Sequence, residues 1–472
     1  MADATMMTTA VEPDGAPRVA SLDILRGIAI LGILFMNIND MGGSIWAFWA
    51  QDVRHLGWSQ ADQIAWFLRE VFADGTARCM LEMLFGVGMV ILTDRVAGAV
   101  ATAPPEGRMG RIIRRLFGPW PVLRSYAWRN IVLFAFGLIH VFVLLWPGDI
   151  LHTYGIAALV AVLFRRLGPK TLLALGLSMA LLQLVGGGVG YLTVPGQRAE
   201  IARLEAQKTS GAALSKAEAE TLTKALERRA AREKGQAEDR ARIVAEDKAR
   251  SDATGTFGTW ASAAWGFFLY LQGQLLEIAL VWEAAATMLV GAALYKWGII
   301  QGARSRAFYV RMTLASYAVG LGSRTVGAIH TMRFDDSPSI MWSLSEVARL
   351  TTTLGHIGLV YLLLSTALGT RLLRPFEAAG RTALTIYIGQ TIICLWLLYP
   401  PFGLGLYGTQ GWMALMLTAV AINALLLMAA NWYVRQYRIA PVEWAWRSIV
   451  ARQLLPIRKR PPLVAGGVPV AA

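Results

Sequence analysis

The chain contains little charge and almost no cysteine. Only 16% of its 472 residues are Asp, Glu, Lys or Arg, whereas 55% are hydrophobic and the mean hydropathy is +0.46. These values exclude an ordinary soluble domain and are typical of a protein with several membrane-spanning helices. The two cysteines, Cys79 and Cys394, lie in apolar stretches and predict neither a disulfide framework nor a cysteine metal site.

Several sequence motifs of well-known enzyme classes are also missing. The chain has no GxSxG nucleophile motif, no Walker A sequence, no dinucleotide-binding fingerprint and no HExxH. We therefore expect no bound cofactor and no metal site, although two histidines and one carboxylate could in principle hold zinc. Residues 1–20 lack an apolar core, so we expect no cleaved signal peptide and assign the role of insertion signal to the first span.

The positive charge of the chain has two explanations. Lys and Arg exceed Asp and Glu by 45 to 31, which gives a net charge of +14. In a soluble protein this excess would suggest nucleic acid, but here the arginine clusters fall between apolar stretches. Retention of basic loops on the cytoplasmic side explains that distribution better, so nucleic acid is not among the expected partners.

The apolar stretches predict an all-α fold, a polytopic helical bundle of about ten transmembrane helices. Each span needs about 20 mostly apolar residues to cross the hydrocarbon. The candidate spans lie near residues 22–40, 77–97, 129–146, 149–165, 171–192, 276–296, 308–328, 345–368, 382–400 and 411–434. The aromatic stretch 257–275 would break the alternation of the spans, and we predict an interfacial or re-entrant helix there.

The loops predict the orientation of the bundle. Basic residues recur in five segments that alternate spans place on one face, the first of them between spans two and three. The positive-inside rule makes this face cytoplasmic, with both termini inside and the tip at Gly148-Asp149 facing outward. We therefore expect a multi-pass protein of a membrane that borders the cytoplasm.

Composition divides the chain into five regions. We expect a disordered tail at 1–20, a membrane half at 21–192, a charged extracytoplasmic helical insertion at 193–256, a second membrane half at 257–450, and a cytoplasmic tail at 451–472. Within the insertion, residues 198–252 hold 13 basic and 11 acidic residues in an Ala-rich background. Many of these charges fall at i,i+4 spacing, so this stretch predicts an external helical hairpin. A solvated insertion without chemistry is the simplest reading of it.

The segment around the third and fourth spans carries the main catalytic candidates. His140 lies about two turns before the tip, and Asp149 and His152 lie at the start of the next helix. Antiparallel neighbours would bring the three together, and an Asp that orients an imidazole is the usual general-base arrangement. Ionisable groups at membrane depth suggest function, but a polar network that ties two helices together is the alternative.

Other polar residues are candidates for binding substrate or donor. Arg26 lies one turn inside the first span, where it could also pair with Asp23 or reach lipid headgroups. With Arg381 and Arg447 it could form a basic cytoplasmic mouth for a phosphorylated ligand, or serve only positive-inside retention. The further candidates, at other depths of the bundle, are Asn37, Tyr154 and Gln390.

Five motifs, in order, resemble the YeiB-type bacterial inner-membrane proteins. They are SLDILRG at 21–27, LFGVG at 84–88, GDILHTY at 148–154, GRTALT at 380–385 and PVEWAWR at 441–447. The resemblance covers nearly the whole chain except the first twenty residues and the charged insertion. The N-terminal half of that family is similar to transmembrane acyltransferases, which implies transfer of an acyl group from cytoplasmic acyl-CoA to an acceptor across the membrane.

The leading hypothesis is therefore an integral-membrane O- or N-acyltransferase. His152 or His140 would act as general base, Asp149 would orient it, and Arg26, Arg381 and Arg447 would hold the phosphates of acyl-CoA. The expected partners are membrane lipids, acyl-CoA as co-substrate, an envelope glycan or lipid acceptor, and a second copy of the chain in a homodimer. The alternative is a transporter or lipid-handling permease, because polar residues occur at several depths of glycine-rich helices. A scaffold that acts through residues 198–252 is a third hypothesis.

Overall fold

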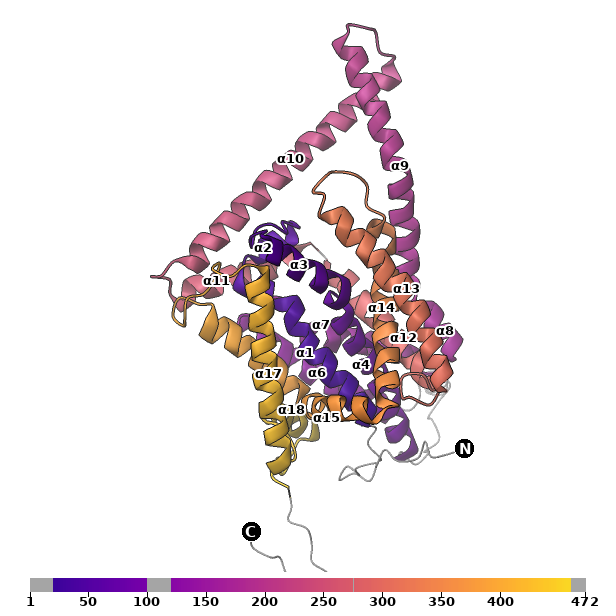
Figure 1. The fold of residues 1–472 in the computed structure, drawn as a ribbon, viewed down its shortest axis with the longest axis vertical. Coiled ribbons are helices and arrows are strands. Elements are labelled where there is room, and N and C mark those ends of the chain that lie inside the picture. The colour runs from indigo at the N-terminus through magenta and orange to yellow at the C-terminus, as the bar shows by residue number, and fades with distance from the viewer. Residues whose placement is uncertain (1–19, 100–119, 275, 460–472) are drawn as a thin grey trace, which may run out of the picture.

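The computed structural model describes residues 20–99, 120–274 and 276–459, and within these ranges the chain forms helices and no β-sheet. The predicted all-α bundle is thus confirmed (Figure 1). The long helices of the bundle are α1 (Ala20–Gly42), α4 (Thr76–Ala99), α6 (Trp120–Phe142), α9 (Ser178–Thr209), α12 (Leu276–Lys296), α13 (Arg306–Thr331), α14 (Met341–Leu364) and α17 (Trp412–Gln436). Residues 1–19 and 460–472 of the expected tails, and much of the basic loop between spans two and three, lie outside the described residues.

Most of the predicted spans are long apolar helices. Among the described residues, seven helices are long and apolar enough to cross a membrane, and one bent pair meets the same criteria. That pair is α15 (Ala367–Arg381) and α16 with its π-helical extension η3 (Ala383–Leu398), which meet at an angle of 79°. The chain is therefore a multi-span membrane protein.

The expected count of ten spans is not confirmed, for two local reasons. The fourth predicted span is the short helix α7 (Leu151–Ala161), which a 3₁₀ turn η2 extends to Phe164. The seventh, α13, is long enough, but its sequence carries Arg311 and Arg324 and is less apolar than the other spans. Both helices nevertheless pack in the bundle, where His152 of α7 and Arg324 of α13 are buried, although Arg311 is exposed.

Glycines allow two pairs of helices to meet backbone to backbone. A Cβ atom on Gly27 of α1 would overlap the carbonyl oxygen of Phe376 on α15, and one on Gly380 of α15 would overlap that of Asp23. The contact of α4 with α12 is similar, since Gly86 faces the carbonyl of Met288. Three of the five motifs thus contain a glycine required by close helix packing.

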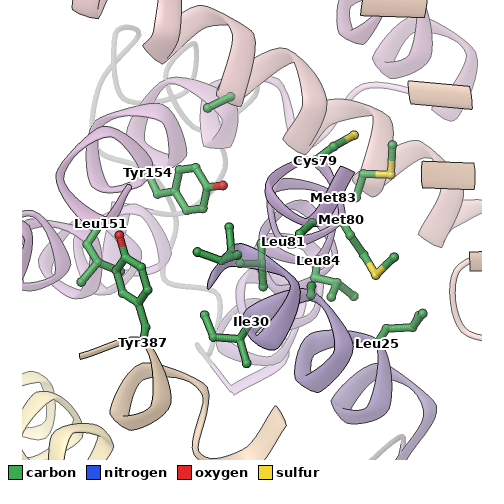
Figure 2. Packing of buried hydrophobic residues seen from close by; sticks show 14 of the residues in the cluster. Leu25, Ile30, Cys79, Met80, Leu81, Met83, Leu84, Leu151, Tyr154 and Tyr387 are labelled. Atoms are coloured by element: carbon green, nitrogen blue, oxygen red, sulfur yellow. The ribbon is translucent and has the colours of Figure 1, made fainter. Parts of the chain in front are cut away.

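Apolar side chains from both halves of the sequence fill the space between these helices. Figure 2 shows Leu151, Tyr154 and Tyr387 on one side of this core and Cys79 and Met80 of α4 on the other. Both cysteines are free and buried.

The charged insertion is an open helical hairpin, as predicted. The α9 helix continues without a break from its apolar part into the first arm, and α10 (Lys216–Ser251) returns as the second arm. The two arms diverge from the tip, so that α10 reaches the opposite side of the bundle, where α11 (Phe257–Gly273) begins (Figure 1). We call the end of the bundle that carries this hairpin the hairpin end, and the opposite end, where α15 lies, the α15 end.

A buried ion pair fastens the returning arm to the bundle. Glu246 accepts hydrogen bonds from the hydroxyl of Ser44 (2.5 Å) and from an Arg250 guanidinium nitrogen (2.9 Å). Arg250 also lies over the rings of Trp260 and Tyr407, with its guanidinium carbon 4.1 and 4.5 Å from their centroids. Both charged groups are buried and have partners. The C-terminal end of α10 therefore has one preferred position on the bundle.

A second contact beside this ion pair predicts that docking of the end of α10 on the bundle depends on pH. His55 Nε2 lies 3.0 Å from an Asp247 carboxylate oxygen, and this hydrogen bond raises the pKa of His55, with Asp52 and Glu246 acting in the same direction. A pKa that is higher in the docked state means that protonation of His55 stabilises docking. This stabilisation is complete below the ordinary histidine pKa of about 6.5, and it is lost as the pH rises through the raised pKa. Hydrogen exchange of the last turns of α10 should therefore accelerate as the pH rises above about 6.5, by no more than roughly fivefold for this partly exposed pair. A His55→Asn variant should exchange at the faster rate throughout, after correction for intrinsic exchange, and an unchanged pH profile in it would contradict this assignment.

Several helices at the two ends were not expected from the sequence. At the hairpin end these are α2 (Ile45–Trp49), α3 (Gln60–Leu68) and a π-helical turn η1 (Arg69–Ala73). At the α15 end they are α15 itself and α18 (Pro441–Ala451), whereas the short helix α8 (Pro169–Gly176) lies at the start of the predicted span 171–192. The predicted interfacial helix at 257–275 is α11, which covers part of the bundle at the hairpin end.

Candidate functional site

A cavity of 940 Å³ lies in the half of the bundle that is nearer the hairpin. Its walls come from α1, α4, α7, α9 and α11 to α14, together with the segment from α2 to η1. Charged side chains line it together with aromatic and aliphatic ones. The ionisable side chains that line it are Asp40, Arg69, Glu70, Asp74, Arg78, Asp149, His152, Glu277, Glu283, Arg324, Glu346 and Arg349.

The loop between α6 and α7 folds back into the bundle. After α6 ends at Phe142, Leu145 adopts a left-handed backbone conformation (φ 64°), which prevents the helix from continuing. Trp146 is almost fully buried. The indole N–H groups of Trp265 and Trp396 donate hydrogen bonds to the carbonyls of Phe142 and Leu144. The Gly148-Asp149 turn is therefore covered by neighbouring helices and Asp149 is buried, while the outward orientation expected for this tip stays a prediction.

Asp149 binds both histidines of the predicted cluster. One carboxylate oxygen lies 2.6 Å from His140 Nδ1, and the other lies 3.0 Å from His152 Nδ1. The second oxygen also accepts the backbone N–H of His152 at 2.9 Å, which caps the first turn of α7. The carboxylate therefore fixes the orientation of two imidazole rings at once.

The two histidines differ in what they can reach. His140 is fully buried, and its Nε2 atom lies 2.8 Å from the hydroxyl of Thr391. With Asp149 on its other nitrogen, both ring nitrogens of His140 are occupied by protein groups. It does not line the cavity, so its contacts are those of a histidine that supports the site.

His152 lies in the cavity wall. Its Nδ1 atom faces Asp149, and its Nε2 atom lies 3.4 Å from a carboxylate oxygen of Glu277 and 3.3 Å from the hydroxyl of Thr153. Thr153 in turn donates a hydrogen bond to Glu277 at 2.8 Å. Phe268 of α11 lies against the imidazole, with ring centroids 5.5 Å apart. The Nε2 atom is thus oriented by Asp149 from behind and lies among polar groups in the cavity wall.

Gly137 of α6 makes room for this arrangement. A Cβ atom on Gly137 would overlap the backbone nitrogen of His152 and would lie 2.7 Å from an oxygen of Asp149. Gly137→Ala should therefore displace α7 from α6 and lower the stability by about 1–3 kcal/mol. Thermal unfolding in detergent would measure this loss. Gly186→Ala on α9, where a Cβ atom would have open space, is the matched control, and equal effects of the two substitutions would contradict the packing argument.

A second cluster of charges borders the cavity, with Arg78, Glu283, Glu346 and Arg349 in its lining. Arg349 lies 2.9 Å from Glu82, 2.9 Å from Glu283 and 2.7 Å from Glu346. Arg78 approaches Glu283 at 2.6 Å. Two guanidinium groups therefore hold three carboxylates, and the helices that carry these residues, α4, α12 and α14, are joined through the network. The hydroxyl of Tyr154 also reaches it, 3.4 Å from Glu82.

A third cluster lies nearer the hairpin. Arg69 pairs with Asp74 at 2.7 Å and donates a hydrogen bond to the carbonyl of Phe35 on α1. Arg324 of α13 donates hydrogen bonds to the backbone carbonyls of Glu70 and Asp74. These bonds join the backbone of η1 and of Asp74, the residue after it, to α13. Their role is to hold η1 against α1 and α13.

The remaining predicted substrate-binding residues of the membrane interior separate into two groups. Asn37 and Tyr154 line the cavity together with Asp149 and His152. Gln390 does not, because its amide nitrogen donates to the carbonyl of Ile30 and to Asn423, and these bonds tie α16 to α1 and α17. The structure thus brings four of the predicted residues to one cavity.

The three predicted donor-binding arginines lie at the α15 end, away from this cavity. Arg26 pairs with Asp23 at 2.6 Å, and Asp23 packs against Gly380, the neighbour of Arg381. Arg447 lies on α18, whose Glu443 accepts the backbone N–H groups of Leu384 (2.6 Å) and Thr385 (3.2 Å) at the start of α16. Burial raises the pKa of Glu443. The GRTALT and PVEWAWR motifs therefore meet at the bend between α15 and α16.

Sequence reasoning missed much of the cavity. Among the residues described, no group of three or more His, Cys, Asp or Glu side chains is arranged to hold a metal ion. The missed residues are the ionic ones, above all Arg78, Glu82, Arg349 and Glu346. Their signal was present, since each is an ionisable residue within an apolar helix, and such residues are functional candidates by default.

The comparisons with known proteins agree with the resemblance drawn from the motifs. The family described as "Protein of unknown function (DUF418)" matches residues 294–453, which run from the end of α12 to α18. The chain is 27% identical over 460 residues to the uncharacterized protein YxaH of Bacillus subtilis (strain 168), covering 94% of this chain and 96% of that protein. It is 25% identical over 441 residues to the uncharacterized protein YeiB of Escherichia coli (strain K12), covering 92% and 97%. No solved structure matches the chain.

Proposed function

We propose that this YeiB-type membrane protein is an acyltransferase that moves an acyl group from acyl-CoA to a cell-envelope sugar or lipid, with His152 as the general base. The observation that supports the proposal is the Asp149–His152 pair in the cavity wall. Asp149 holds Nδ1 of the imidazole at 3.0 Å, so that Nε2 is the atom left to take a proton. His140 would support Asp149 from the enclosed side.

The chemical step needs little beyond this pair. Nε2 of His152 takes the proton of an acceptor hydroxyl or amine as its oxygen or nitrogen attacks the thioester carbonyl carbon. The new C–O or C–N bond forms, the C–S bond breaks, and the departing thiolate receives the proton from His152. Glu277, 3.4 Å from Nε2, would stabilise the imidazolium that exists between the two transfers.

The donor would bind at the α15 end, near Arg26, Arg381 and Arg447, which we propose as the cytoplasmic face. His152 is 13 residues from Arg165 at the other end of α7, which corresponds to about 20 Å along a helix. The acyl group must therefore travel deep into the bundle, and the extended pantetheine arm of coenzyme A suits that path. The guanidinium groups would hold the phosphates at the bundle surface.

The test is transfer of radiolabel from [acetyl-¹⁴C]acetyl-CoA by the detergent-purified protein. Total envelope lipid and glycan fractions serve as acceptors, and release of free coenzyme A is followed in parallel. Label in one fraction, together with thiol release, is the expected result. No transfer and no thioester hydrolysis with any fraction would overturn the proposal.

A transporter is the second candidate, and one observation favours it. The network of Arg78, Glu82, Glu283, Glu346 and Arg349 has no part in the acyl-transfer step, yet buried ionic networks of this kind occur in ion- and proton-coupled carriers. This candidate predicts flux of a substrate into proteoliposomes without consumption of acyl-CoA. A proton uptake signal that Glu283→Gln abolishes would favour it over the enzyme.

A further inference from the structure

One wall of the cavity also faces the lipid. Leu182 of α9 lines the cavity and is 65% exposed, and it lies in the apolar part of a membrane-spanning helix. Across the cavity, Leu276 and Leu280 of α12 line the same space and are half-buried. A side chain that borders both the cavity and the hydrocarbon marks an opening between them.

The helix contacts explain why the opening is at this place. The end of α8 and the start of α9 contact α12. A Cβ atom on Gly176 would lie 2.8 Å from the carbonyl of Ala286, and the hydroxyl of Ser178 accepts the indole N–H of Trp282 at 3.1 Å. Beyond Ser178, α9 is held by α14 instead. There Gln183 accepts the backbone N–H of Glu346 at 2.7 Å, and Gly187 meets the backbone of Trp342. The α9 and α12 helices therefore separate just where Leu182 faces the cavity.

The charges of the cavity limit what can occupy it. Seven carboxylates line it, against four guanidinium groups. The arginines are engaged with carboxylates or backbone carbonyls, as at Arg349 and Arg324, whereas Glu277 has His152 and Thr153 as its partners. In a low-dielectric surrounding, a further negative charge beside Asp149 and Glu277 would be strongly unfavourable.

We propose that a membrane lipid enters this cavity sideways between α9 and α12. Its head group, which carries a hydroxyl or an amine and no net negative charge, lies at His152 and Glu277, and its hydrocarbon chain passes between Leu182 and Leu280 into the bilayer. As the identity of the acyl acceptor this inference rests on the proposed function. As a binding site for a lipid it does not require turnover, and it can be tested without it.

The test uses a diacylglycerol with a photoreactive diazirine in one acyl chain and an alkyne for detection. The full-length protein is placed in phosphatidylcholine nanodiscs, irradiated and digested, and the labelled peptides are identified by mass spectrometry. Label is expected on α9 around Leu182 and on α12 around Leu280. Leu182→Trp, which fills the opening, should reduce this label by at least about fivefold. Leu181→Trp is the matched control, because Leu181 is 61% exposed on the same turn and does not line the cavity.

Competition tests the head group. Unlabelled diacylglycerol should remove the label, and phosphatidic acid with the same chains should not. If Leu182→Trp elutes as an aggregate, Leu280→Trp is tested in its place. Equal labelling of the two α9 variants, label spread over all lipid-facing helices, or equal competition by phosphatidic acid would overturn the inference. Specific label without acyl transfer would instead overturn only the proposed acyltransferase function. Acyl transfer to a water-soluble acceptor without specific label would overturn only the lipid-binding inference.

Discussion

Replacing His152 with glutamine is expected to lower the rate of acyl transfer by about 10²- to 10⁴-fold, the usual contribution of a general base. Glutamine keeps a polar group near Asp149 but offers no nitrogen that takes up a proton at neutral pH. Because the substitution removes proton transfer and leaves the rest of the cavity lining, kcat should fall while KM changes little. The assay is the same transfer from acetyl-CoA, read at several acceptor concentrations.

His356→Gln is the matched control for this variant. His356 also lies within a membrane helix, between the hydroxyl of Tyr317 at 2.8 Å and the carbonyl of Phe72 at 2.9 Å, but it does not line the cavity. The His356→Gln variant should retain its acyl-transfer activity when the rate is expressed per amount of folded protein. A His152→Gln enzyme with more than about a tenth of the normal kcat would remove His152 from the role of base.

The second large effect is expected at Arg349. Its removal in Arg349→Ala would leave Glu82, Glu283 and Glu346 with Arg78 as the one guanidinium of the network. Breaking a buried ion pair from one side commonly costs about 3–5 kcal/mol, since the remaining charge stays buried without compensation. Unfolding of the purified protein in mixed micelles of increasing SDS fraction would measure the loss of free energy.

A double substitution separates charge from packing. In Arg349→Met with Glu82→Gln, one positive and one negative charge leave together and the apolar stem of the arginine is replaced, so much of the stability should return. Arg203→Ala, at an exposed ion pair of the hairpin, should have little effect in either measurement. If Arg349→Ala alone unfolds no more easily than Arg203→Ala, the network does not hold the helices together.

The sequence predicted the helices well where their hydrophobicity was continuous. The predicted span at 276–296 coincides with α12, because Lys296 ends the apolar run on one side and the short polar sequence Gln272-Gly273-Gln274 precedes it on the other. The predicted span at 129–146 was less accurate. The α6 helix begins at Trp120, since Arg124 and Arg129 lie on a helix that extends beyond the apolar stretch, and it ends at Phe142, before the left-handed Leu145.

The candidate site was predictable in part, for a physical reason. His140, Asp149 and His152 lie within 13 residues, so two antiparallel helices suffice to bring them together, and the sequence contains that information. The partners of Arg349 come from α4, α12 and α14, and Thr391 reaches His140 across 251 positions. Such contacts depend on which helices are neighbours, and periodicity in one sequence does not determine that arrangement.

The glycine contacts between helix backbones also govern how the bundle can move. At Gly27 against Phe376, and at Gly86 against Met288, no side chain lies between the two helices that could change rotamer and let one slide past the other. The pairs α1–α15 and α4–α12 must therefore move as rigid blocks. Any opening of the cavity then takes place along seams that side chains fill, such as the one between α9 and α12 or the contact of Phe268 with His152. Opening would therefore require cavity helices outside these two pairs, such as α9 and α11, to move relative to the rigid blocks.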